Sequence, residues 1–304
     1  MSIRIAVLAG GLGGSRCVDA LARAAGPEAV TAIVNVGDDL EAFGLHVSPD
    51  LDTVLYTLAG LLDEQRGWGI RDDTTDALAI VGRLGGSTWF TLGDRDLGVH
   101  LVRTELLRHG HPLSFVSSRL AEALGVRTPL LPATDDRLRT WISTPDGELP
   151  FQEWYVHRRH ADRVLGVRFE GADEAQPAPG VLEAIASADL VIIAPSNPYV
   201  SIFPILAVRE IRNAVAARGA VAISPIIDGK ALRGPLAEMM QDQGVGASPA
   251  GIAALYDGLA TRIVLDPADA AQAEDIPGAV ICPIVMADPD QRAEVGRQLL
   301  EALL

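Results

Sequence analysis

The chain has 304 residues, 48% of them hydrophobic and 21% charged, which is enough apolar material for a large core in one or two domains. Its net charge of −15 argues against binding to nucleic acid or to anionic lipid, because both usually need a basic face, so we expect a small-molecule ligand. No run reaches the roughly 18 apolar residues of a membrane span, and the first residues lack a signal-peptide pattern, so we expect a cytoplasmic protein with no membrane partner.

Short runs rich in β-branched residues alternate with longer segments of helical period. The expected strands are residues 3–9, 29–36, 189–195, 220–227, 261–265 and 279–285. A helix is expected over 50–63, where leucine and valine recur on one face. This alternation predicts an α/β fold with a doubly wound, Rossmann-like parallel sheet.

The middle of the chain departs from the alternation. Helical patterns over 74–84, 96–110 and 112–126 precede a hairpin over 139–154, which turns at Pro-Asp-Gly. We therefore predict that residues 70–165 form an inserted, mainly helical cap with a β-hairpin, while 1–69 and 166–304 form the core.

A glycine-rich loop follows the first expected strand. Its glycines are Gly10, Gly11, Gly13 and Gly14. Such a loop before a helix points free amides at an anion, although it can also be a tight strand-to-helix turn. Because Arg16 stands where a dinucleotide fingerprint needs its last glycine, and no Gly-Lys-Ser/Thr ending is present, the loop indicates a phosphate or nucleotide without specifying which.

Acidic side chains crowd the segment after the second expected strand, at positions 38, 39, 41, 50 and 52. Open α/β sheets bind ligands at this edge. Hard oxygen ligands beside a phosphate loop suit Mg²⁺, and we assign Asp39 and Asp50 as its candidate ligands. Asp50 follows Pro49 and fits equally well as a first-turn helix residue.

Two further polar loops are candidates. Arg95 lies between Asp94 and Asp96 after a glycine turn, a pattern that also fits a solvated helix start. Ser196 and Asn197 follow an apolar strand and are placed to read a base or ribose. The six histidines are scattered and suggest no metal-binding pair.

Five stretches together carry a resemblance to a known family. They are AGGLGGSR, SPDLDTVLY, LGDRD, PSNPYVSI and SPIIDGKALRGPLAEMM, and they span essentially the whole chain. In this combination the chain resembles the 2-phospho-L-lactate transferases of coenzyme F420 biosynthesis. The resemblance implies a Mg²⁺-dependent transferase in which the deazaflavin alcohol Fo (7,8-didemethyl-8-hydroxy-5-deazariboflavin) attacks a guanosine-diphospho-activated three-carbon acid and GMP leaves.

The resemblance also implies roles for single residues. The core would hold nucleotide and Fo, with the guanylyl diphosphate on the glycine loop. Asp50 matches the acidic position at the Fo and metal site, as metal ligand or as proton acceptor, and Thr53 shares that pocket. Thr91 matches an Fo-contacting position where some relatives carry lysine, and Asn197 matches the nucleotide loop. For Arg95 we expect charge neutralisation during transfer. A homodimer is expected from the family and from apolar positions in the inserted helices.

Two other classes of function fit parts of the same sequence. An NAD(P)-dependent oxidoreductase would need an acidic residue at the end of the second strand, where Asn35 and Val36 stand. A non-catalytic nucleotide-sugar-binding regulator of the gluconeogenesis-factor type would share the glycine loop but would not be expected to share SPDLDTVLY and LGDRD. The sequence leaves the transferred acid open among lactate, phosphoenolpyruvate and glycerate.

Overall fold

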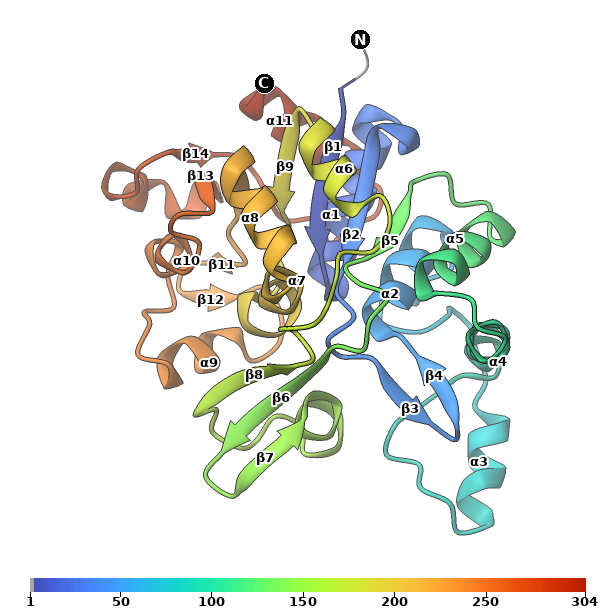
Figure 1. Ribbon diagram of the computed structural model, residues 1–304. Helices are drawn as coiled ribbons and strands as arrows, with labels where there is room; N and C mark the ends of the chain where they lie inside the picture. Colours follow the sequence, from blue (N-terminus) through green and yellow to red (C-terminus); the bar gives the residue numbers. More distant parts are fainter. Residues whose placement is uncertain (1–2) are drawn as a thin grey trace.

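A seven-stranded parallel sheet forms the centre of the computed structural model, which describes residues 3–304 (Figure 1). From edge to edge its strands are β14 (Ala279–Ile281), β13 (Ala260–Leu265), β10 (Ala220–Ile223), β9 (Leu190–Ile193), β1 (Ile5–Ala9), β2 (Val30–Val34) and β5 (Leu130–Pro132). All adjacent pairs are parallel, and the strand order reverses between β1 and β9. The predicted doubly wound, Rossmann-like class is confirmed.

The sheet is buried on both faces, and side chains alternate between two cores. Along β1, Ile5, Val7 and Ala9 belong to one core, while Ala6 and Leu8 belong to the other. The first core is covered by α1 (Gly11–Ala25), α2 (Pro49–Leu58), α5 (Leu113–Ala123) and α11 (Arg292–Leu303). The second is covered by α6 (Val181–Ser187), α7 (Phe203–Ala207), α8 (Arg209–Arg218), α9 (Leu236–Asp242) and α10 (Pro249–Leu255).

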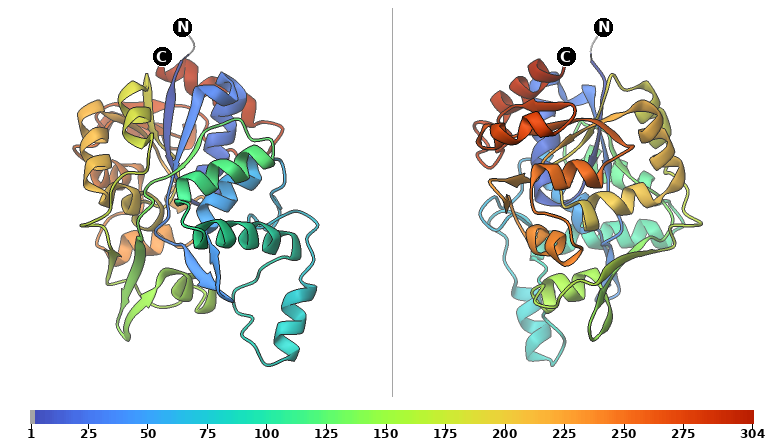
Figure 2. Two further views of the ribbon diagram at one scale, coloured as in Figure 1. Left: turned by 45° about the vertical axis from the view of Figure 1, so that its right-hand side comes forward. Right: turned by 90° about the vertical axis from the view of Figure 1, so that its left-hand side faces the viewer.

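The remaining elements gather at the carboxyl ends of the strands, at the bottom of Figure 1. They are the hairpins β3 (Leu40–Ala42) with β4 (Leu45–Val47) and β11 (Ile226–Ile227) with β12 (Lys230–Ala231), helices α3 (Asp76–Arg83) and α4 (Asp94–Arg108), and the antiparallel sheet of β7 (Gly147–Pro150), β6 (Arg139–Thr144) and β8 (Gly166–Glu170). Short helical turns lie at Pro27–Ala29, Glu153–His157, Pro198–Ile202 and Pro267–Asp275. Figure 2 shows α3 projecting away from this end of the molecule.

The predicted strands, the three helices of the middle segment and the hairpin are present, with three differences. The helix predicted over 50–63 ends at Leu58, and Gly60 then adopts a left-handed φ of 69°. Strand β5 lies within 70–165 yet pairs with β2 in the central sheet. It is the edge strand of that sheet, a position at which its proline is tolerated. Strand β8 begins at residue 166 but pairs with β6. The predicted limits at 70 and 165 therefore do not coincide with the boundaries of the sheets.

None of the helices in the described part of the chain has the length and apolar content to cross a bilayer.

Candidate active site

A cavity of about 380 Å³ opens at the carboxyl ends of the strands, beside β1 where the strand order reverses. Open α/β sheets bind their ligands at this point, and the volume lies in the range of small-molecule sites. The cavity wall includes the segments 10–13, 67–69, 90–92, 195–197 and 232–236, together with side chains from α2 and α4.

Most of the predicted site residues meet in this cavity. Its wall contains Gly10, Gly11, Gly13, Asp50, Thr53, Thr91, Ser196 and Asn197. Gly14, Asp39 and Arg95 lie outside the wall. Gly14 packs inside α1 against Ala9, Asp39 is buried beside the site, and Arg95 is exposed and donates to the carbonyl of Arg71. The location of Arg95 gives no support to the predicted role in charge neutralisation.

The glycine loop is held tightly by its own neighbours. A Cβ on Gly13 would collide with the carbonyl oxygen of Pro195, and a Cβ on Gly10 would lie 2.5 Å from Asp50 Oδ2. Gly11 begins α1 with a left-handed φ of 61°, and its N–H donates to Asp50 Oδ1 at 2.7 Å. The N–H groups of Leu12 and Gly13, also in the first turn, have no intrahelical acceptor and remain to bind an anion.

Replacing Gly13 by Ala should destabilise the protein by about 1–3 kcal/mol, because the added methyl group must push the backbone of Pro195 away from the loop. Binding of GDP should weaken as well, since the amides of the first turn move. Gly98→Ala is the matched control, because a Cβ there meets nothing within 4 Å in the middle of α4 and alanine favours a helix. Thermal unfolding and calorimetric titration check both variants, and equal behaviour of the two would contradict the packing argument.

Asp50 connects three elements. It lies in the first turn of α2, after the N-cap Ser48 and Pro49, so it is not itself the cap. Its Oδ1 accepts from the N–H of Gly11 on α1, and its Oδ2 accepts from Asn35 Nδ2 at 2.9 Å, directly after β2. Burial, opposed by these two hydrogen bonds and reinforced by the charge of Asp39, raises the pKa of Asp50 from 3.8 to about 6.

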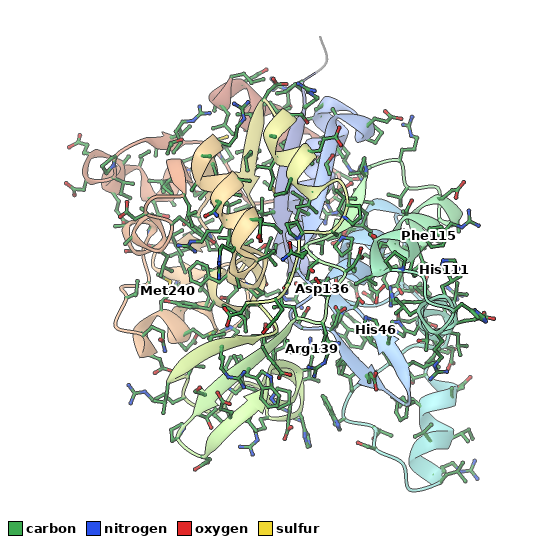
Figure 3. The ribbon with its side chains drawn as sticks, viewed as in Figure 1. His46, His111, Phe115, Asp136, Arg139 and Met240 are labelled. Atoms are coloured by element: carbon green, nitrogen blue, oxygen red, sulfur yellow. The ribbon has the colours of Figure 1, made fainter. Side chains whose placement is uncertain are left out.

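Two more carboxylates crowd this corner. Asp38 lines the cavity and accepts from Gln152 Nε2 at 3.2 Å; burial and the charge of Asp50 raise its pKa well above the ordinary value. Asp39 Oδ2 accepts from Ser48 Oγ at 3.0 Å and lies 2.9 Å from Nε2 of His46. Figure 3 labels His46. Asp39 Oδ1 is buried without a partner among the described residues.

Three buried carboxyl groups therefore lie close together in this corner, and burial with their mutual repulsion raises the pKa of two of them. Buried oxygen ligands of this kind fit Mg²⁺, which takes one or two carboxylates and completes its shell with water and phosphate oxygens. Asp38 and Asp50 face the cavity, whereas Asp39 lies behind it. Asp38, one residue from the predicted Asp39, is thus the better placed partner for Asp50.

The raised pKa of Asp50 predicts how stability depends on pH in metal-free buffer. Between pH 4 and pH 6 the folded chain keeps a proton that the unfolded chain has lost, so raising the pH favours unfolding. Relative to Asp50→Asn, wild type should lose on the order of 2 kcal/mol between pH 4.5 and pH 7.5. Urea unfolding of both proteins at the two pH values measures this difference, and a difference independent of pH would refute the assignment.

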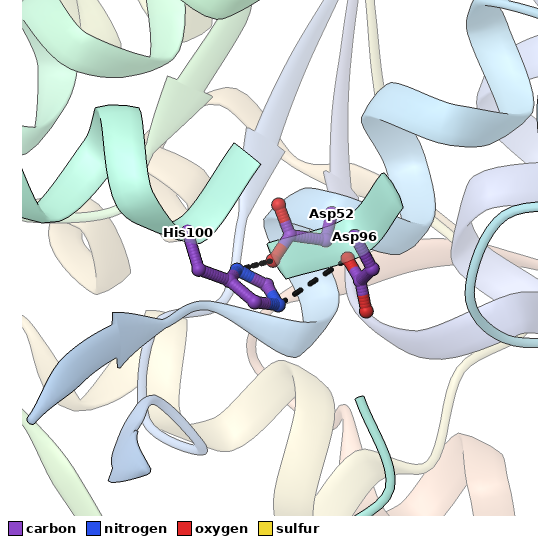
Figure 4. Close-up of side chains that lie close together, drawn as sticks. All are labelled: Asp52, Asp96 and His100. Carbon is purple, nitrogen blue, oxygen red and sulfur yellow. Dashed lines mark ion pairs between the residues drawn. The ribbon is translucent and has the colours of Figure 1, made fainter. Parts of the chain in front are cut away.

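A second buried cluster lines the cavity and was missed by the sequence analysis (Figure 4). His100 Nε2 lies 3.2 Å from Asp96 Oδ1, and His100 Nδ1 lies 3.7 Å from Asp52 Oδ2. Tyr56 donates to Asp96 Oδ1 at 2.5 Å. Arg103 contacts Asp52 through both terminal nitrogens and lies 3.0 Å from His100 Nδ1. Since a guanidinium only donates, His100 accepts at Nδ1 and carries its proton on Nε2, facing Asp96.

Arg103 supplies the cation of this cluster. Its burial lowers its pKa, but the charge and hydrogen bonds of Asp52 raise the pKa above the ordinary value. Asp52, Asp96 and His100 have the residue types and spacing of metal ligands, yet Arg103 already occupies the carboxylate of Asp52. We therefore interpret the cluster as a network that joins α4 to α2, although Arg103 Nε and His100 Nε2 are buried without a hydrogen-bond partner among the described residues. The spacing of Asp96, His100 and Arg103 along one helix face was the available signal.

Aromatic side chains form another part of the cavity wall. They are Tyr56, Trp68, Phe90, Phe151 and Tyr155. Such a surface suits a planar ring system. On the other side, Ser196 donates to the carbonyl of Gly10 at 2.7 Å, and the Asn197 side chain accepts from the N–H of Tyr199 at 3.0 Å. The cavity thus joins an aromatic region, an acidic corner and a helix N-terminus.

Comparisons with known proteins agree over nearly the whole chain. A family model described as 2-phospho-L-lactate transferase CofD matches residues 5–280. A phosphoenolpyruvate transferase of Streptomyces griseus is 43% identical over 311 residues, covering 98% of both chains. One of Nocardia farcinica is 41% identical over 312 residues, covering 98% of this chain and 94% of the relative. A crystal structure of a UPF0052 family member from Bacillus halodurans matches with a TM-score of 0.62 at 19% identity, covering 99% of both chains, a likeness of fold alone.

Proposed function

Because the chain belongs to the 2-phospho-L-lactate transferase CofD family, we propose that it transfers a phosphorylated three-carbon acid from a guanosine diphospho-conjugate to Fo, releasing GMP. The relatives named phosphoenolpyruvate transferase favour phosphoenolpyruvate as the transferred unit, which gives dehydro-F420-0. The observation that carries the proposal is the single cavity in which the glycine loop, Asp50 and the aromatic wall meet.

The proposed step forms one phosphorus–oxygen bond and breaks another. A hydroxyl of the Fo side chain attacks the phosphorus that bears the three-carbon acid, and the bond from that phosphorus to GMP breaks. The attacking hydroxyl loses its proton, and GMP leaves with the bonding electron pair. Most of the catalysis in such a transfer comes from positioning and from stabilising charge on the phosphate oxygens.

The residues of the cavity divide these tasks. The amides of Leu12 and Gly13 and the N-terminus of α1 bind the diphosphate. Asp50 either holds the metal or accepts the proton, and a pKa raised to about 6 suits a carboxylate that must accept a proton near neutral pH. Asp38, together with Asp50 where Asp50 is the metal ligand, would hold Mg²⁺, which would supply charge neutralisation at the phosphate oxygens. The aromatic wall orients the deazaflavin ring of Fo.

Incubation of the purified protein with Fo, Mg²⁺ and each guanylylated acid, followed by mass detection, tests this proposal. The donors are the phosphoenolpyruvate, lactate and glycerate conjugates. We expect dehydro-F420-0 and equimolar GMP, formed fastest from the phosphoenolpyruvate donor. Binding of the nucleotide without any transfer to Fo would reject the enzyme and favour a non-catalytic nucleotide-binding regulator.

For the assembly we propose a homodimer. None of the residues of α3 is buried, and Leu84 directly after it is 83% exposed. Ile80, on the same helix, is 49% exposed. Apolar side chains in this setting commonly mark an interaction site. Light scattering at micromolar concentration should give twice the mass of the chain, and a monomer would contradict the proposal.

A further inference from the structure

The charge of the cavity wall is strongly one-sided. Four aspartates line it, Asp38, Asp50, Asp52 and Asp96, whereas Arg233 is the one arginine or lysine in the wall formed by the described residues. A guanylylated acid brings a diphosphate and a carboxylate into this space. An anionic substrate among carboxylates needs cationic partners, and Arg103 is already paired with Asp52.

Arg233 bridges two segments beside the cavity, 66–69 and 232–236. It lies between β12 and α9, and its Nη2 donates to the carbonyl of Arg66 at 2.7 Å. The guanidinium lies so close to Gly67 that a Cβ there would collide with it. Gly67 has a left-handed φ of 76° and no side chain, so there is room for this contact. The side chain is thus held at the cavity by one hydrogen bond to a loop.

Most of the donors of this guanidinium remain available. Within residues 3–304 its side chain makes that single hydrogen bond and no ion pair. A guanidinium carries five N–H donors in a planar fork that matches the oxygens of phosphate or carboxylate. Because Arg233 is exposed, reorienting toward a ligand requires no repacking of the core.

We propose that Arg233 is a substrate-binding residue that contacts the anionic oxygens of the donor, either its diphosphate or the carboxylate of its three-carbon acid. The inference rests on the proposed function and assigns to Arg233 the contact expected from Arg95, whose guanidinium lies outside the cavity. Binding exchanges the hydrogen bond to Arg66 for charge-assisted bonds to the substrate.

Calorimetric titration of GDP and of guanylylated phosphoenolpyruvate into wild type, Arg233→Gln and Lys230→Gln tests the proposal. Lys230, on β12 three residues before Arg233, is an exposed cation that does not line the cavity. Arg233→Gln should weaken binding of the complete donor by about 10- to 100-fold, whereas Lys230→Gln should change it less than about twofold. Arg233→Lys keeps the charge and should recover part of the loss.

The two probes identify the group that is bound. Weaker binding of both ligands places Arg233 on the diphosphate, and weaker binding of the complete donor alone places it on the carboxylate. The salt dependence of the donor Kd should also be shallower in Arg233→Gln than in wild type. Unchanged donor affinity in Arg233→Gln would overturn the inference. These titrations need no Fo, so a wild type that binds the donor but transfers nothing rejects the proposed function separately.

Discussion

Replacing Asp50 by Asn should lower the rate of transfer to Fo by about a hundredfold or more while the chain stays folded. Asn has neither the charge that would hold Mg²⁺ nor the basicity that would take the proton of the attacking hydroxyl. The position also joins the glycine loop to α2 through the bond from Gly11 to Asp50 Oδ1. Because the lost charge and basicity serve the reaction, the rate of transfer should fall much more than the stability.

The effect on stability follows from the two hydrogen bonds of Asp50. The side-chain oxygen of the introduced Asn can accept from the Gly11 N–H or from Asn35 Nδ2, but not from both. Its NH₂ group then faces the remaining donor and cannot accept from it. Loss of one such bond costs about 1–2 kcal/mol. Removal of a buried charge offsets part of that cost near neutral pH. The net change should be small, although Asp50 is not the helix cap.

The melting temperature and the rate of GMP release with Fo present decide between the two roles. Glu41→Gln is the control, because Glu41 belongs to the same acidic segment but is exposed on β3. We expect Asp50→Asn to melt near wild type with little turnover, and Glu41→Gln to match wild type in both. Near wild-type turnover of Asp50→Asn would reduce Asp50 to a structural residue.

Replacing Arg103 by Met should destabilise the protein by about 3–5 kcal/mol. The side chain is 2% exposed and pairs with Asp52, which is buried as well. Removing the guanidinium leaves the buried Asp52 carboxylate without its ion-pair partner. It also takes away the donor to His100 Nδ1, so the network between α2 and α4 opens. The melting temperature should fall by on the order of 10 °C.

A second variant shows whether the charge causes the loss. In the double variant Asp52→Leu with Arg103→Met both members of the pair are apolar, so the Asp52 charge no longer stays buried without its partner. It should be clearly more stable than Arg103→Met alone, as for other buried pairs that are replaced together. If Arg103→Met alone melts within about 2 °C of wild type, the account of this network is contradicted.

The sequence predicted the sheet well because its strands carry a local signal. The runs around β1, β2, β9 and β10 are continuous and apolar, as expected for parallel strands buried on both faces. Strand β5 has only three residues and no period to detect, so its pairing with β2 depended on tertiary contacts.

The parts of the candidate site that lie on loops next to strands could be predicted from the sequence. The glycine loop follows β1 and the Ser196–Asn197 turn follows β9, and the carboxyl ends of parallel strands meet at one edge. Asp50 belongs to the acidic segment that follows β2. Which of two neighbours faces the cavity was not predictable. Asp38 rather than Asp39 lines the cavity, and two adjacent aspartates after a strand carry no period that separates them.

The central claim is that one cavity receives both the nucleotide and Fo. A crystal structure of the protein with Fo, GDP and Mg²⁺ tests it most directly. We expect the diphosphate at the amides of Leu12 and Gly13, the metal beside Asp50, and the deazaflavin ring against the aromatic wall that includes Trp68 and Tyr155. GDP or Fo bound outside this cavity, with the acidic corner empty of metal, would contradict the account.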